Sequence, residues 1–256
     1  MDTMDVKHQK AFCPQMIEVL HLQKWEQVIT PYWMQINLYT STRGINRFVG
    51  LQNVLLMLEK EYGVELPFTQ ALCDWIRTTK SLSGQALREY IQQRKDTVLQ
   101  PVLDWSDAVN SAIRALPHTD RPFEGAAQTL AYAHTKTDTA VVSSANTAAV
   151  ETEWSRHGIL DSMDVVMGQE AGSKANCISS LLQKGYRPEH VLMVGDALGD
   201  LQAAQQNGVL FYPILVGKEA ESWRELQEQA LPRLLSGNFD KDYQDRLIAR
   251  QRDILR

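Results

Sequence analysis

The sequence has 256 residues, of which 44% are hydrophobic, and it carries a formal net charge of −5. This length is enough for one large domain or for a core domain with a smaller partner, and the hydrophobic fraction allows a substantial core. The mild negative charge argues against binding to nucleic acid or to anionic membranes, both of which attract a basic surface. It still allows a local basic pocket for a phosphorylated substrate.

Cysteine content and the N-terminal residues bear on the compartment. The three cysteines are odd in number, widely spaced and never in a CxxC pair, which argues against a disulfide framework or a zinc site. The first 12 residues contain no apolar stretch of the kind a signal peptide has, and no run of about 18 apolar residues occurs anywhere in the chain. We therefore expect a cytoplasmic protein.

The first part of the chain has the periodicity of helices. Apolar residues recur at helical spacing in segments 15–29, 46–62, 68–78, 83–97 and 104–116, and Asp104 or Ser106 is a possible cap for the last of them. No convincing strand precedes residue 138. The turn-rich stretch from Pro117 to Pro122 separates this part from the next. We expect residues 1–118 to form an all-helical domain.

The second part alternates short apolar runs with amphipathic segments. Candidate strands at 139–143, 164–167, 191–194 and 209–216 are interleaved with candidate helices at 124–134, 146–157, 174–184 and 199–206. This order predicts an α/β fold with a Rossmann-like parallel sheet in residues 119–218. Residues 219–256 are expected to form a helical C-terminal tail of two helices, with a break from Ser236 to Asn238.

The most informative motif is VLMVGDALGDLQ, which starts at Val191. An apolar strand ends in Gly195 and Asp196, and Asp200 follows where a helix is expected to begin. Carboxylates at the carboxyl end of a parallel strand are suited to binding Mg²⁺, which prefers oxygen ligands. The alternative is that both aspartates only cap the helix.

Two weaker signals lie upstream. In AVVSSANT a strand ends at Ser143, and Ser144 and Asn146 precede a helix, so hydroxyl and backbone N–H groups could bind an anion there. Serine and asparagine are also ordinary helix caps. Lys174 follows a short strand and lies near a helix start, although a lone lysine is usually a solvated surface charge.

The order of these three signals resembles motifs II, III and IV of the haloacid dehalogenase superfamily. The first is a serine after one strand, the second is the lysine, and the third is the GD-x3-D sequence after another strand. The resemblance covers about residues 120–218. It implies that Ser143 binds a phosphoryl oxygen, that Lys174 balances the charge of the nucleophile and the phosphoryl group, and that Asp196 helps to hold Mg²⁺. Asp200 matches the second acid of motif IV. The implied activity is that of a Mg²⁺-dependent phosphatase, or of a phosphomutase, acting on a small phosphorylated metabolite.

The sequence departs from this family at motif I, DxDGT, whose first aspartate is the nucleophile. No DxDGT occurs in the 256 residues, and the pairs Asp104–Asp107 and Asp2–Asp5 have the wrong spacing. Two explanations remain open: an N-terminally truncated hydrolase, or a non-catalytic module that binds phosphate. In the family the motif I strand lies between the strands of motifs II and IV. We therefore expect the chain to be unstable alone, or its 139–143 and 191–194 strands to pair directly.

The helical domain matches the position of the family's cap, which closes over the site and selects the substrate. Arg43 and Arg47 are four residues apart, as on one face of a helix. Guanidinium groups suit phosphate or carboxylate recognition, so both are candidate substrate-binding residues. The alternative is a surface helix with solvated arginines. The sequence does not indicate the substrate or the oligomeric state.

Overall fold

The computed structural model describes residues 1, 3–117 and 120–256 of the chain. Contacts divide the chain into two compact units next to the boundary expected between residues 118 and 119: one is Thr3–Thr119, and the other is Asp120–Arg256 together with Met1–Asp2. The two units are described separately below as the helical unit and the α/β unit. None of the described helices combines the length and the apolar character needed to span a membrane.

The described residues of the helical unit form helices and no strands, as the periodicity predicted. Asn46 caps one long helix through its side chain, and Gly63 ends it in the left-handed conformation, φ 65°. The helices in chain order are α1 (Met4–Lys7), the π-helix η1 (His8–Phe12), α2 (Cys13–Val19), η2 (Gln23–Trp25), α3 (Glu26–Met34), the π-helix η3 (Gln35–Tyr39), α4 (Arg47–Tyr62), α5 (Thr69–Thr78), α6 (Gly84–Arg94) and α7 (Gln100–Ala115).

Two details of the helix prediction are wrong. The single helix expected at 15–29 is interrupted between Val19 and Glu26, where His21 takes a positive φ of 55°. The last helix begins at Gln100 rather than at 104, so Asp104 and Ser106 lie inside α7 and do not cap it. Apolar periodicity continues through both places, which is why it does not reveal the break or the true start.

Large aromatic side chains fill the centre of the helical unit. Trp33, Trp75 and Trp105 are each 0% exposed. Phe48 makes edge contacts with Trp75 and Trp105, with ring centroids 5.0 and 6.2 Å apart. Edge-to-face pairs of this kind add to the large area that each ring buries. This unit therefore has a closed core of its own.

The α/β unit contains four short strands and seven α-helices in its described residues. Val141 in β1 and the residues 211–213 of β4 are buried, while the other strand residues are partly or fully exposed. The elements in chain order are α8 (Ala126–His134), β1 (Ala140–Val142), α9 (Thr147–Arg156), η4 (Leu160–Ser162), β2 (Val165–Met167), η5 (Gln169–Ala171), α10 (Lys174–Leu182), η6 (Pro188–His190), β3 (Leu192–Gly195), α11 (Leu198–Asn207), β4 (Leu210–Pro213), α12 (Glu219–Glu225), the π-helix η7 (Leu226–Ala230), α13 (Leu231–Leu235) and α14 (Lys241–Ile254).

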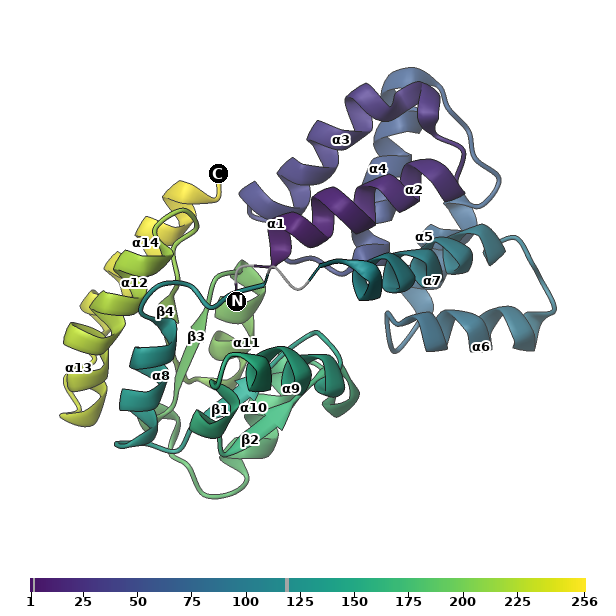
Figure 1. Ribbon diagram of the computed structural model, residues 1–256. Coiled ribbons are helices and arrows are strands. Elements are labelled where there is room, and N and C mark those ends of the chain that lie inside the picture. Colours follow the sequence, from purple (N-terminus) through teal and green to yellow (C-terminus); the bar gives the residue numbers. More distant parts are fainter. Residues whose placement is uncertain (2, 118–119) are drawn as a thin grey trace. The chain divides into compact units, whose positions relative to one another are not determined.

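The strands pair in parallel, but in two separate sheets. β1 pairs with β2, and β3 pairs with β4. Figure 1 shows the two ribbons within one unit, with helices around them. The expectation that segments 139–143 and 191–194 pair directly is therefore wrong for the described residues. The predicted parallel strand pairs are present. They form two sheets of two strands each and not one Rossmann-like sheet.

Helices cover both faces of the β3–β4 sheet. Leu192 and Val194 point into one apolar cluster, which contains residues of α8 and of the segment from α12 to α14. Met193 lies between them in sequence and points into a second cluster formed mainly by α10 and α11. This alternation is the period-2 pattern of a strand, and it makes the unit a three-layer α/β/α arrangement.

The C-terminal tail packs on the α/β unit. Its two helical parts are separated by Ser236–Asp240, close to the predicted break. Helix α14 contacts β4, and the Gln244 side-chain oxygen accepts a hydrogen bond of 2.8 Å from the Phe211 backbone N–H. A helix thereby covers the outer edge of β4, which is a common way of protecting a sheet edge.

Candidate active site

A partly buried ion pair joins the first turns of α10 and α11 in the α/β unit. Lys174 is the first residue of α10, which follows β2, and its Nζ donates a hydrogen bond to Oδ1 of Asp200. Asp200 lies in the first turn of α11, which follows β3, and it is 1% exposed. Because Lys174 and Asp200 each follow the carboxyl end of a strand, their contact brings the carboxyl ends of β2 and β3 to the same end of the unit.

Asp200 is held on its other side as well. Its Oδ2 accepts a hydrogen bond of 3.1 Å from the Ala197 backbone N–H. A Cβ added to Gly195 would collide with the same oxygen, so this strand end must be glycine for the carboxylate to fit. Both oxygens of Asp200 are therefore engaged, one by the Lys174 ammonium and one by the Ala197 N–H.

Ser143 follows β1, whose parallel pairing with β2 places it at the same end as Lys174. Its backbone N–H donates to Met167 O at 2.9 Å. Its Oγ accepts a hydrogen bond of 3.1 Å from the Ala145 N–H, and Asn146 caps α9 by accepting from the Ala149 N–H at 2.7 Å. Ser144 is exposed between them. The loop from Ser143 to Asn146 is thus an ordered turn that leads into a helix N-terminus.

Glu170 lies next to the candidate residues at the start of α9, and the motifs did not reveal it. Its Oε2 accepts hydrogen bonds from the backbone N–H and from Oγ1 of Thr147, at 3.0 and 2.9 Å. The hydrogen bond from the Thr147 backbone lowers the pKa of the Glu170 carboxyl. This contact ties the loop after β2 to the N-terminus of α9, and the only signal for it in the sequence is an acid placed between β2 and Lys174.

The described acids offer a limited set of ligands for Mg²⁺. Asp196 directly follows β3 and is partly exposed at the strand end. Asp200 has both oxygens engaged, and no group of three or more His, Cys, Asp or Glu residues within the described ranges is arranged to hold a metal. Mg²⁺ needs only one or two carboxylates when water and phosphate complete its shell. Among the described acids Asp196 is therefore the candidate ligand, and Mg²⁺ binding there stays a prediction.

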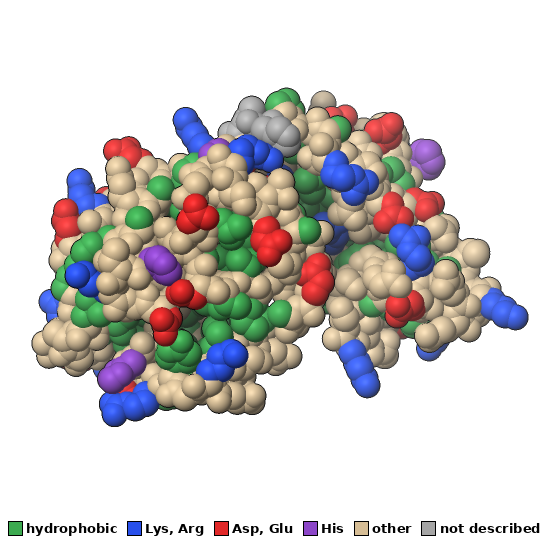
Figure 2. Space-filling model, turned by 60° about the horizontal axis from the view of Figure 1, so that its bottom comes forward, with side chains coloured by type: hydrophobic (Ala, Val, Ile, Leu, Met, Phe, Trp, Pro, Cys, Tyr) green, Lys and Arg blue, Asp and Glu red, His purple; other side chains and the backbone are tan. Residues whose placement is uncertain are grey.

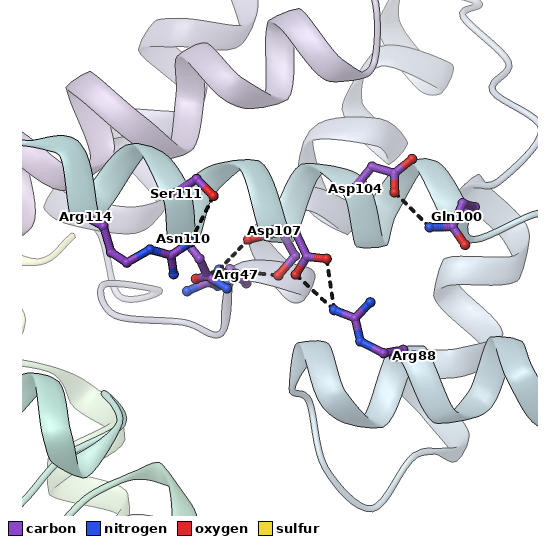
Figure 3. A network of polar contacts seen from close by, with 9 residues as sticks. Arg47, Arg88, Gln100, Asp104, Asp107, Asn110, Ser111 and Arg114 are labelled. Atoms are coloured by element: carbon purple, nitrogen blue, oxygen red, sulfur yellow. Dashed lines mark hydrogen bonds and ion pairs between the residues drawn. The ribbon is translucent and has the colours of Figure 1, made fainter.

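The two candidate arginines of the helical unit do not share a helix face. Arg43 lies in a turn before α4, is 7% exposed, and donates to Leu38 O at 2.7 Å. Arg47 is the first residue of α4 and donates to Ser106 and Asn110 of α7, the latter at 2.8 Å (Figure 3). These contacts hold the unit together, and substrate binding by either arginine stays a prediction.

Charged side chains do not form a patch of one sign on the surface shown in Figure 2. On the face shown in Figure 2, positive and negative side chains of the described residues are interspersed, without one extended basic area. This distribution agrees with the small net charge of the sequence.

The comparison with protein families gives one finding. A family model described as haloacid dehalogenase-like hydrolase matches residues 45–214, which is more than half of the chain and contains every candidate site residue except Arg43. No curated protein and no solved structure shows a significant match. The extent of the family match, together with strand ends that carry Ser143, Asp196 and the Lys174–Asp200 pair, shows that the chain belongs to the haloacid dehalogenase-like hydrolases.

Proposed function

We propose that this chain provides the phosphate site of a Mg²⁺-dependent phosphatase that acts on a small phosphorylated metabolite. The observation that carries the proposal is the bond between Lys174 and Asp200, because it holds a lysine ammonium at the strand ends that also bear Ser143 and Asp196. A hydroxyl, an ammonium and a carboxylate at one edge are the groups that phosphoryl transfer requires for binding and charge balance.

Each residue has a distinct part in the proposal. The Ser143 hydroxyl binds a phosphoryl oxygen, with Ser144 and Asn146 shaping the turn. Lys174 neutralises the negative charge that builds up on the phosphoryl group, and Asp200 keeps its ammonium in place. Asp196 would hold Mg²⁺, which supplies Lewis-acid stabilisation when bound.

The nucleophile of this phosphatase must come from an additional segment, because the 256 residues contain no DxDGT. We propose that the catalytic protein carries a further strand with this motif. An aspartyl nucleophile divides phosphoryl transfer into two steps, formation and hydrolysis of a phospho-aspartate. Transfer to a sugar hydroxyl in place of water, as in a mutase, uses the same residues.

The second candidate function is a non-catalytic module that binds phosphate through Ser143 and Lys174. The absence of the nucleophile motif from the sequence favours it. The two functions use the same residues and differ only in turnover. They are therefore separated by activity and not by binding.

The test compares the 256-residue chain with a version in which an apolar strand ending in DxDGT precedes it. Hydrolysis of an aryl phosphate with Mg²⁺ is measured for both. We expect activity only in the longer version, and we expect Lys174→Met to lower its kcat by about 100-fold or more, as for the loss of an electrostatic contact in a transition state. Ser180→Ala on the exposed side of α10 is the matched control and should leave kcat unchanged. Inactivity of both versions, with phosphate binding retained, would favour the non-catalytic module.

A further inference from the structure

The loop after β1 and the loop after β2 remain hydrogen-bonded to each other beyond the ends of the two strands. The Ser143 N–H donates to Met167 O at 2.9 Å, and the Gln169 N–H donates to Ala145 O at 2.8 Å. One bond runs in each direction, so each loop is held by the other. The contact between the two segments therefore continues into the turn that carries Ser143.

The Glu170 side chain adds a further contact between these loops. Its Oε2 accepts from the Thr147 N–H at 3.0 Å and from the Thr147 hydroxyl at 2.9 Å. Thr147 is the first residue of α9, and the N–H groups of a first helical turn have no acceptor within their own helix. A carboxylate is also favoured at this end of a helix by the helix dipole. Glu170 thus fixes the start of α9.

Close approach of the two backbones brings Glu170 within reach of α9. A Cβ added to Gly168 would collide with the backbone nitrogen of Thr147. Because glycine has no Cβ, the loop after β2 can pass directly beside the helix start. Gly168 therefore allows the contact that Glu170 makes two residues later.

Apolar packing contributes little to the placement of α9. Of its ten residues only Val150 is buried. At the other end of the helix, Arg156 and the following His157 bond to Asp120 at 2.7 and 3.0 Å. Polar contacts therefore hold α9 at both ends, and Glu170 makes the side-chain contact from the neighbouring loop at its N-terminal end.

Glu170 also lies close in sequence to the candidate lysine. Four residues after it, Lys174 begins α10, and Ser173 caps that helix by accepting from the Asn176 N–H at 3.2 Å. Because the segment between Glu170 and Lys174 is short, the bond to α9 restricts the distance between the Ser143 turn and the start of α10.

We propose that Glu170 is a positioning residue, which holds the Ser143 turn beside the start of α10 so that Ser143 and Lys174 bind the same phosphoryl group. This inference rests on the proposed function, because that function assigns the phosphate to these two residues. Glu170 acts through its hydrogen bonds to Thr147 and not through its charge, since a carboxylate repels a phosphoryl oxygen.

The test is the binding of inorganic phosphate to the full 256-residue chain with Mg²⁺, measured by isothermal titration calorimetry. We expect Glu170→Ala to raise the dissociation constant by about tenfold or more, because the turn loses both bonds to the carboxylate. Glu170→Gln keeps an acceptor oxygen at the same reach and should stay within about threefold of the parent chain. Glu151→Ala removes the same charge from an exposed position on α9 and is the matched control, with no change expected.

Two further measurements separate positioning from a general loss of structure. If Glu170 acts by placing Ser143, then Glu170→Ala should weaken phosphate binding by less than about threefold when Ser143→Ala is already present. Amide exchange measured by NMR reports on the contact itself. The Thr147 N–H should exchange about tenfold faster in Glu170→Ala than in the parent chain, because it loses its acceptor.

Several results would overturn the proposal. Glu170→Ala would bind phosphate like the parent chain, Glu170→Gln would lose as much affinity as Glu170→Ala, or the effects of Glu170→Ala and Ser143→Ala would be additive. An unchanged exchange rate of the Thr147 N–H in Glu170→Ala would mean that Glu170 does not hold the start of α9. Failure of the proposed function is distinguishable from these results. In that case the parent chain itself binds no phosphate, and the exchange rate of Thr147 still decides whether Glu170 holds the turn.

Discussion

The helical unit and the α/β unit differ in how completely they bury their apolar residues. In the helical unit, Trp33, Trp75 and Trp105 are 0% exposed and lie at the centre of one continuous cluster. In the α/β unit, the apolar residues divide into two clusters on opposite faces of the β3–β4 sheet, and β3 itself stays partly exposed. One unit is closed by its own helices around one cluster, whereas the other has its strands in two separate two-stranded sheets.

The physical reason is the separation along the sequence of the residues that must hydrogen-bond in each unit. A helix satisfies its backbone hydrogen bonds internally, so a helical unit needs only apolar faces that meet. A strand satisfies them only through neighbours, and parallel neighbours come from distant parts of the chain. The backbone hydrogen bonds of a parallel sheet therefore depend on every segment that contributes a strand. Those of a helix depend only on the helix itself.

The largest expected effect is the loss of a central aromatic residue in the helical unit. Trp75 is fully buried, packs against Phe48, and its indole N–H has no hydrogen-bond partner among the described residues, so packing alone stabilises it. Trp75→Ala should lower the free energy of unfolding of this unit by about 3–5 kcal/mol, whereas Met193→Ala in β3 should cost roughly 1 kcal/mol because Met193 is partly exposed.

Urea unfolding followed by tryptophan fluorescence and by circular dichroism measures both changes. Trp75→Phe is the control for ring packing and should cost clearly less than Trp75→Ala, because it keeps a ring and removes an unpaired N–H. Equal losses for Trp75→Ala and Met193→Ala would mean that β3 is as well packed as the helical core, and the contrast between the units would be wrong.

Most secondary structure followed from local patterns in the sequence. The helix predicted at 46–62 is present as α4, because Asn46 and Gly63 mark its ends by side-chain capping and by a left-handed backbone. All four predicted strands are present within three residues of their expected bounds, because each is a short apolar run between turn residues. The break between α2 and α3 was missed, since apolar residues continue through it.

Strand pairing and part of the site could not be predicted in this way. Which strand pairs with which depends on contacts between distant residues, and a local pattern contains no information on them. The roles of Lys174 and Asp200 were assigned separately by resemblance, while the structure shows that they bond to each other. Glu170 was missed because its partner Thr147 lies 23 residues away in the sequence, and a local pattern does not show that the two meet.

The second prediction concerns the buried charge pair, which is the polar counterpart of the aromatic core. Asp200 is 1% exposed, so removing its cation leaves a buried carboxylate with only the Ala197 N–H as a partner. Lys174→Met should destabilise the α/β unit by roughly 2–4 kcal/mol, because an unpaired buried charge keeps its desolvation cost. The measurement is urea unfolding, followed by the fluorescence of Trp154 and Trp223 after the four tryptophans of the helical unit are replaced by phenylalanine.

The exposed Lys184, which follows α10, provides a matched control, since Lys184→Met removes the same charge without an ion pair. Adding Asp200→Asn to Lys174→Met should restore part of the loss, because the buried charge is then gone. If Lys174→Met and Lys184→Met had equal effects, the pair would contribute nothing to the stability of this unit.

The smallest expected effect is a pH dependence confined to the helical unit. Burial, together with the charges of Arg43 and Arg47, lowers the pKa of His8 from 6.5 to about 4. Trp33 Nε1 donates a hydrogen bond of 3.0 Å to Nδ1 of His8, which requires that nitrogen to be unprotonated. The folded unit therefore favours neutral His8, while the unfolded chain takes up a proton below pH 6.5. The stability contribution is complete above pH 6.5 and is lost as the pH falls toward 4. With allowance for partial exposure, it amounts to about 2 kcal/mol.

Unfolding of the helical unit by urea at a series of pH values between 7 and about 4.5 measures this contribution through the fluorescence of its four tryptophans, with Trp154 and Trp223 replaced by phenylalanine. His8→Gln keeps a neutral acceptor for Trp33 and should flatten the pH dependence in this range. His190→Gln, an exposed histidine of the α/β unit, should leave it unchanged. If the profile of His8→Gln followed that of the parent chain, the loss of stability would come from other groups, and the helical unit would owe none of its acid sensitivity to the environment that Trp33 and the two arginines create around His8.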